Sequence, residues 1–113
     1  MNKVEAIIRP ERLDAVKEAL AAAGFVGLNI VAVTGRGVQK GIVHSGRGGE
    51  EYRVDMLPKS KVELVVTDGE TDKAVNTIID AARTGSIGDG KIFVSPVTRS
   101  IRIRTGETGD AVL

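Results

Sequence analysis

Two stretches of helical apolar spacing, each lying between two short runs typical of β-strands, constrain the fold of this chain more than any other feature. The first stretch begins at Pro10, which suits the first turn of a helix, and Gly24 is placed to end it. The second stretch follows Asp68 and ends at residues 84–85. The strand-like runs that flank them are residues 3–8, 25–34, 59–68 and 91–97.

This order predicts an α+β fold of the ferredoxin-like βαββαβ type, in which an antiparallel four-stranded sheet carries both helices on one face. A chain of 113 residues has room for one hydrophobic core, so we expect residues 1–113 to form a single domain. The second sheet face would be left bare. Because self-association is the simplest way to cover such a face, we also expect an oligomer.

The composition argues against several classes of protein. A formal net charge of +1 gives no general attraction to nucleic acid or to an anionic membrane. No apolar run approaches the ~20 residues that span a bilayer, and the N-terminal residues lack the apolar core of a signal peptide. The chain has no Cys and one His, which argues against disulfides, thiolate chemistry and a protein-only zinc site. A cytoplasmic protein is expected.

Residues 35–52 hold six of the 14 glycines. They could cradle phosphates, bind RNA as a basic strip, or form a mobile arm that contacts another protein. The glycine spacing at 35–37 does not match the dinucleotide-binding fingerprint, and no helix follows it. Glu50 and Glu51 offset the arginines, and Tyr52 is the only aromatic residue available for base stacking, which argues against RNA. Phosphate binding and a protein contact stay open.

Residues 85–92, GSIGDGKI, resemble a phosphate-binding P-loop in spacing only. Ile92 stands where Mg²⁺ requires Ser or Thr, and the segment leads from a helix into a strand, the reverse of a Walker loop. Three glycines and a lysine can still form a concave run of backbone amides that holds an anion. The alternative is a helix C-cap followed by a turn. The two interpretations are about equally supported.

Arg and Ile alternate from residue 99 to 104, which predicts an extended tail with Arg102 and Arg104 on one face. This face could bind a triphosphate, or it could be a solvated edge that discourages aggregation. Lys59, at the start of a strand, is placed to bind a carboxylate, although a single surface lysine often has no such role. His44 has no catalytic partner in motif spacing, and no catalytic dyad emerges, so the sequence predicts no enzyme.

Taken together, several segments resemble the PII signal-transduction family over essentially the whole chain. The most specific is TGSIGDGKIFV at residues 84–94, which reproduces one of the family's sequence patterns. The supporting segments are residues 3–20, 35–41, 52–59 and 101–107.

The resemblance implies a homotrimer that binds ATP or ADP in the clefts between protomers. The loop of residues 88–91 would wrap the phosphates, and the two arginines of the tail would reach them from the neighbouring protomer. Other residues would line the cleft or surround the base and ribose. The implied nucleotide-binding residues are Asn29, Gly35, Gly37, Val38, Gln39, Glu63, Leu64, Val65, Gly88, Asp89, Gly90, Lys91, Arg102 and Arg104.

The resemblance also implies binding of 2-oxoglutarate together with Mg-ATP. Gln39 would complete the Mg²⁺ sphere, the amides of Lys40 and Gly41 would receive one carboxylate, and Lys59 would receive the distal one. A 2-oxoacid can chelate Mg²⁺ through its keto and carboxylate oxygens. ADP lacks the phosphate that fixes the metal, so the long loop of about residues 36–54 would change conformation with the bound ligands. The C-terminal tail would comprise about residues 98–113.

The segment GRGVQKG is nearer to the ammonium-transporter-associated branch of the family. That branch implies that Arg47, at the loop tip, blocks an Amt-type transporter at the cytoplasmic face of the membrane. Regulation of a soluble nitrogen-metabolism enzyme (glutamine synthetase or an arginine-pathway kinase) and slow ATP hydrolysis are the alternatives, and nucleic acid is not an expected partner. Val38 replaces a polar residue of many members. One extra residue within 47–52 alters the context of Tyr52, which aligns with a tyrosine that is uridylylated in some bacteria.

Overall fold

The structure, a computed structural model, describes residues 1–45 and 51–113, and within these the side chains of residues 1–36 and 56–113. Its strands are β1 (Asn2–Ile8), β2 (Asn29–Ser45), β3 (Glu51–Val66) and β4 (Gly90–Pro96), and its α-helices are α1 (Leu13–Ala22) and α2 (Thr71–Ala82). Short 3-10 helices precede both α-helices and lie near the C-terminus: η1 (Pro10–Arg12), η2 (Asp68–Glu70) and η3 (Asp110–Val112).

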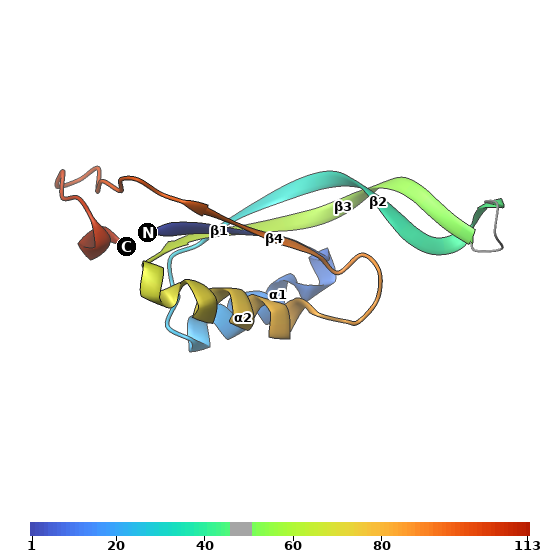
Figure 1. The fold of residues 1–113 in the computed structure, drawn as a ribbon, viewed down its shortest axis with the longest axis horizontal. Helices are drawn as coiled ribbons and strands as arrows, with labels where there is room; N and C mark the ends of the chain where they lie inside the picture. The colour runs from blue at the N-terminus through green and yellow to red at the C-terminus, as the bar shows by residue number, and fades with distance from the viewer. Residues whose placement is uncertain (46–50) are drawn as a thin grey trace.

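The four strands form one antiparallel sheet in the order β2-β3-β1-β4. Figure 1 shows α1 and α2 side by side beneath this sheet, so that one face is covered and the other is bare in the single chain. The predicted α+β, ferredoxin-like arrangement is therefore confirmed. It places the α2–β4 loop (residues 83–89) at the same end of the sheet as the C-terminal end of β1 (Figure 1).

Strand alternation and helical spacing build the core between the two layers. Along β1, every second residue is buried against the helices, and the same alternation holds in β3 from Ser60 to Val66. From α1 and α2, the residues that share one helical face complete the layer. The buried apolar residues are Val4, Ala6, Ile8, Val16, Leu20, Val62, Leu64, Val66, Ala74, Ile78 and Ala82.

The end of α1 follows from Gly24, as the sequence predicts. Gly24 adopts a φ of 95°, in the left-handed region that favours glycine. Its amide donates to the Ala21 carbonyl at 3.0 Å, and the amide of Phe25 donates to the Leu20 carbonyl at 2.9 Å. These two bonds form a Schellman motif, which satisfies carbonyls that the end of a helix would otherwise leave free.

The strand boundaries around the glycine-rich segment differ from the predicted ones. β2 begins at Asn29, four residues after the predicted start of the strand, and runs on to Ser45, while β3 begins at Glu51. Much of the predicted loop of residues 36–54 therefore continues the two strands. Backbone pairing needs no side chains, so glycine does not prevent it. Beyond the pair Thr34–Pro58, these strands form the β2–β3 arm (residues 35–45 and 51–57), which projects past the helices in Figure 1.

The C-terminal segment is not the extended strand that the alternation of Arg and Ile predicts. Ile101 pairs with Thr108 in an isolated bridge, and the amide of Gly106 donates to the Arg102 carbonyl at 2.7 Å. The chain therefore turns back on itself around residues 103–105. Gly106, with a φ of 74°, permits the turn, and this non-local pairing overrides the local pattern. None of the described helices is both long and apolar enough to span a membrane.

Candidate functional site

The α2–β4 loop is packed against the end of β1. Gly90, the first residue of β4, has a φ of 104°, and a Cβ atom at this position would lie 1.7 Å from the Ile7 carbonyl oxygen. Only glycine allows the two strands to approach in this way. Gly88 also has a positive φ, and a Cβ there would lie 3.0 Å from a guanidinium nitrogen of Arg9. The glycines of this segment thus permit close contact with β1 and with the residue that follows it.

The carboxylate of Asp89 organises the loop from within. It accepts hydrogen bonds from the Thr84 amide at 2.8 Å, the Gly85 amide at 2.9 Å and the Thr84 hydroxyl. The Arg9 Nε donates to the same carboxylate at 3.1 Å. These donors, the Thr84 hydroxyl first, hold the pKa of Asp89 well below its ordinary value. The side chain of Asp89 is therefore occupied inside the loop.

Two carbonyl groups of the loop are held by cations from neighbouring elements. Arg9 Nη2 donates to the Ile87 carbonyl at 2.6 Å, and Lys59 Nζ donates to the Gly88 carbonyl at 2.7 Å. The backbone amides of Ile87, Gly88 and Asp89 make no hydrogen bond to another described residue. Backbone amides that are free in this way can donate to an anion.

A hollow of about 600 Å³ lies in front of this loop. It brings together five residues that the sequence singles out as ligand-binding: Gly35, Lys59, Gly88, Gly90 and Lys91. The other lining residues are Ile7, Arg36, Leu57, Ile87 and Phe93. One wall is therefore cationic and rich in backbone donors, and the other is apolar. This combination suits a ligand that has a phosphate group and an apolar part.

A second hollow of about 510 Å³ gathers the residues expected around a base and ribose, Asn29, Glu63, Leu64 and Val65, together with Lys3, Gly27 and Leu28. Here Glu63 is held between two lysines, with Lys61 Nζ at 3.0 Å and Lys3 Nζ at 3.1 Å. Hydrogen bonds from Lys61 and Lys3 lower the pKa of Glu63, and bonds to Glu5 and Glu63 raise the pKa of Lys3. An ionised Glu63 can only accept hydrogen bonds, so it suits a ligand hydroxyl that donates one.

Comparison with known proteins gives the family. The family described as "Nitrogen regulatory protein P-II" matches residues 1–107. The chain belongs to the P-II family. It is 55% identical over 109 residues to "Nitrogen regulatory protein P-II 2" of Methanothermobacter thermautotrophicus, a match that covers 96% of this chain and 94% of the relative. A "Nitrogen regulatory protein P-II" of Nostoc punctiforme is 60% identical over 107 residues, 95% of each chain, and one of Klebsiella oxytoca is 56% identical over 113 residues, 100% of each.

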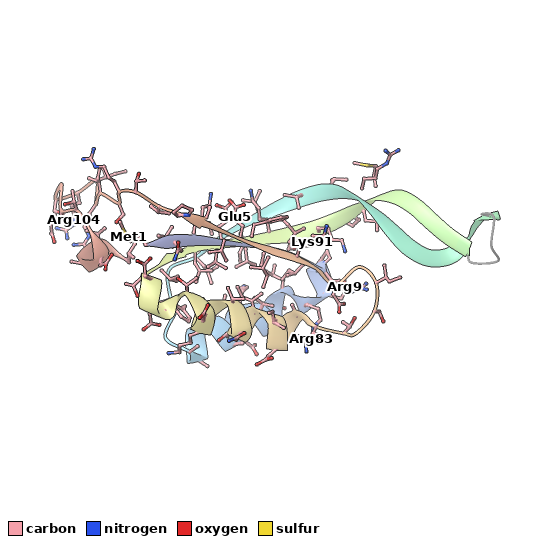
Figure 2. The ribbon with its side chains drawn as sticks, in the orientation of Figure 1. Met1, Glu5, Arg9, Arg83, Lys91 and Arg104 are labelled. Atoms are coloured by element: carbon pink, nitrogen blue, oxygen red, sulfur yellow. The ribbon has the colours of Figure 1, made fainter. Side chains whose placement is uncertain are left out.

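This P-II chain is thus a nitrogen regulatory signal-transduction protein, and its relatives carry the names of regulators. Its tail arginines do not reach the α2–β4 loop of their own chain. Figure 2 shows Arg104 at the opposite end of the sheet from Arg9 and Lys91. Arg102 is bound locally, with Nη1 at 3.3 Å from the Glu107 carboxylate and Nη2 at 3.4 Å from the Ala111 carbonyl.

The remaining predicted site residues of this P-II chain are described only in part. Gly37, Val38, Gln39, Lys40 and Gly41 lie in β2, and Tyr52 lies in β3 opposite Lys40, but their side chains are outside the described residues. Arg47 lies outside the described residues altogether. Among the described residues, no three His, Cys, Asp or Glu side chains are grouped so that they could hold a metal ion.

Arg9 is the residue at this P-II site that the sequence analysis misses. It makes two hydrogen bonds to the α2–β4 loop, to the Ile87 carbonyl and to the Asp89 carboxylate, and it occupies the space that a Cβ on Gly88 would need. A sequence signal exists, since Arg9 is a charged residue between the apolar strand of residues 3–8 and the helix that starts at Pro10. The signal does not reveal the contact, because Arg9 and Asp89 are 80 positions apart in the chain.

Proposed function

We propose that this P-II protein is a non-catalytic sensor of ATP, ADP and 2-oxoglutarate that acts as a homotrimer and regulates an Amt-type ammonium transporter. The observation that supports nucleotide binding most strongly is the hollow in front of the α2–β4 loop. Gly88, whose amide has no other described partner, and the cations Lys59 and Lys91 line it together. Oriented amides and positive side chains are the donors that phosphates bind in proteins.

The second hollow supports binding of the base and ribose. Its separation from the first hollow supports a nucleotide site that is shared between copies of the chain. The two hollows have no lining residue in common. Arg104 lies far from Lys91 in the single chain, so an arginine of the tail can meet phosphates at this loop only from another protomer (Figure 2). A trimer in which neighbouring protomers face each other at these hollows would join the two halves of the site.

The exposed apolar residues also support self-association. Phe93 is 54% exposed on the bare face of the sheet, and Ile103 in the tail is 100% exposed. Large apolar side chains gathered outside a core mark surfaces that another protein covers. Among the described residues the large exposed apolar side chains are Val26, Ile30, Val31, Met56, Ile87, Phe93, Val94, Ile101, Ile103 and Leu113.

Binding of 2-oxoglutarate is supported by Lys59. Its ammonium group has three donors and uses one of them on the Gly88 carbonyl, so it can still bind a carboxylate. The described residues offer no acidic cluster for Mg²⁺, and the metal would be held by phosphate and 2-oxoacid oxygens with Gln39. The amides of Lys40 and Gly41 would take the other carboxylate. Mg-ATP would then be a condition for binding.

The β2–β3 arm begins at the hollow, since its first pair, Gly35 and Leu57, lines the hollow, and the arm projects away from the domain (Figure 1). A ligand at the root of the arm can therefore change what its tip presents. We place Arg47 as the contact that blocks the transporter when ADP is bound or 2-oxoglutarate is scarce. The protein would be cytoplasmic and would join the membrane through its partner.

Calorimetry with ATP, ADP and 2-oxoglutarate, with and without Mg²⁺, tests the sensor. We expect Lys59→Met to abolish 2-oxoglutarate binding and largely to preserve ADP binding. Lys17→Met, which removes a lysine of α1 outside both hollows, should change neither. Binding of 2-oxoglutarate without Mg-ATP would contradict the proposed linkage. A pulldown with purified transporter tests the partner: equal capture with ADP and with ATP plus 2-oxoglutarate would exclude it as the regulated target.

A further inference from the structure

Arg9 lies between β1 and η1, and its guanidinium group is directed to the α2–β4 loop (Figure 2). Its side chain is 19% exposed and that of Asp89 is 24% exposed, so both are largely withdrawn from solvent. The guanidinium donates from Nη2 to the Ile87 carbonyl and from Nε to the Asp89 carboxylate. One rigid group thus binds two points of the loop, on either side of Gly88.

These contacts determine where the loop amides point. In a trans peptide the C=O and N–H groups point in opposite directions, and the chain contains no cis peptide among its described residues. The bond from Arg9 to the Ile87 carbonyl therefore turns the amide of Gly88 away from Arg9. The bond from Lys59 to the Gly88 carbonyl acts in the same way on the amide of Asp89. Both amides are left without a partner among the described residues.

Arg9 also balances the negative charge that the Asp89 carboxylate gives to the loop. An ionised Asp89 next to an anion-binding surface would repel phosphate. The carboxylate is instead turned inward, where it accepts bonds from Thr84, Gly85 and Arg9, and the guanidinium opposes its charge. A neutral amide in place of Arg9 could not balance this charge, and its single NH2 group could not replace both the Nε and the Nη2 bonds.

We infer that Arg9 is a positioning residue of the phosphate site, which fixes the outward direction of the Gly88 amide and balances the charge of Asp89 from behind the loop. The inference rests on the proposed function in that it takes nucleotide phosphates as the ligand. Arg9 does not itself touch the ligand. Replacement of Arg9 should therefore weaken the binding only of ligands that carry phosphate.

Arg9→Gln tests this inference, with Arg12→Gln as the matched control. Arg12 lies in the same turn and also donates to a backbone carbonyl, that of Ala81 at 2.9 Å, but no hydrogen bond or ion pair joins it to a described residue of the α2–β4 loop. We expect Arg9→Gln to bind ADP and tripolyphosphate about tenfold more weakly and adenosine within about twofold of the original protein, since a hydrogen bond involving a charged group is lost. Arg12→Gln should keep all three affinities.

A second measurement needs no ligand. In amide NMR spectra of the ligand-free protein, Arg9→Gln should shift or broaden the resonances of Gly88 and Asp89, and Arg12→Gln should not. Arg9→Lys keeps the charge but can hold the loop at fewer points, so its ADP affinity should lie between those of Arg9→Gln and the original protein.

Several outcomes would overturn the inference. One is an Arg9→Gln protein that binds ADP as the original does, and another is an equal loss of ADP and adenosine. If Arg9→Gln does not fold, unchanged ADP affinity and loop resonances in Arg9→Lys overturn it instead. If the original protein binds no nucleotide, the proposed function fails. The Gly88 and Asp89 resonances then decide the positioning role alone.

Discussion

Replacement of Gly90 by alanine is the sharpest test of how the α2–β4 loop is fixed to the sheet. The added Cβ would lie 1.7 Å from the Ile7 carbonyl oxygen and 2.8 Å from the Ile7 carbonyl carbon. These are backbone atoms of β1, so the clash cannot be relieved by a side-chain rotation. Strand β4 would have to move away from β1 at its first residue, where Gly90 pairs with Ile8.

The cost has two parts. A left-handed backbone costs an L-residue about 1–2 kcal/mol, and overpacking adds about 1–3 kcal/mol, so Gly90→Ala should lose about 2–5 kcal/mol. Gly24→Ala is the matched control, because Gly24 has a similar φ of 95° with nothing within 4 Å of its Cβ position. It should lose the backbone part alone, about 1–2 kcal/mol. The difference between the variants measures the steric part.

Urea unfolding followed by circular dichroism, at one fixed protein concentration, measures both losses. With a slope of about 2 kcal/mol per molar urea, the midpoint of Gly90→Ala should lie roughly 0.5 M or more below that of Gly24→Ala. Equal midpoints would refute the reasoning, because the close approach of Gly90 to Ile7 would then carry no energetic cost.

Two further predictions concern the core and the loop. Leu20→Ala should lose about 2–5 kcal/mol in the same unfolding assay, since Leu20 is fully buried, whereas Val26→Ala, at a residue 86% exposed, should change stability by less than about 0.5 kcal/mol; comparable losses would contradict the described core. Because the folded pKa of Asp89 lies below its unfolded value of about 3.9, its bonds stabilise the protein above that pH, and this contribution is lost as the pH falls through the folded pKa. In a carboxyl NMR titration Thr84→Val should raise the Asp89 midpoint, and an unchanged midpoint would show that the hydroxyl is not the main cause.

Much of the fold could be predicted from local patterns in the sequence. Val16 and Leu20 in α1 and Ile78 in α2 lie on the apolar faces that helical spacing predicts, and all three are buried. Gly24 ends α1 as expected. The strand boundaries and the tail conformation that the sequence analysis predicts wrongly depend on backbone pairing with segments elsewhere in the chain. The strands continue into the glycine-rich segment because main-chain pairing does not depend on side chains, and the tail turns back because Ile101 pairs with Thr108.

The sequence predicts several residues of the site, but it does not predict how contacts between distant segments position them. Glycines followed by a lysine indicate an anion-binding loop, and the structure brings Gly88, Gly90 and Lys91 into one hollow with Lys59. Which ligands these residues bind remains a prediction. The role of Arg9 could not be read from the sequence, because it depends on a contact between the end of β1 and a loop that only the folded sheet brings together.

The β2–β3 arm has a mechanical consequence. From Thr34 to Ser45 an extended strand spans about 35 Å at roughly 3.3 Å per residue, and Lys59, at its root, is bonded to the α2–β4 loop. An arm of this length multiplies small rotations at its root: if it tilted as one body by about 5° at the hollow, its far end would move by about 3 Å, close to the rise of one strand residue. A change in the hydrogen bond of Lys59 that tilted the arm would therefore move its far end far enough to make or break a contact with another protein.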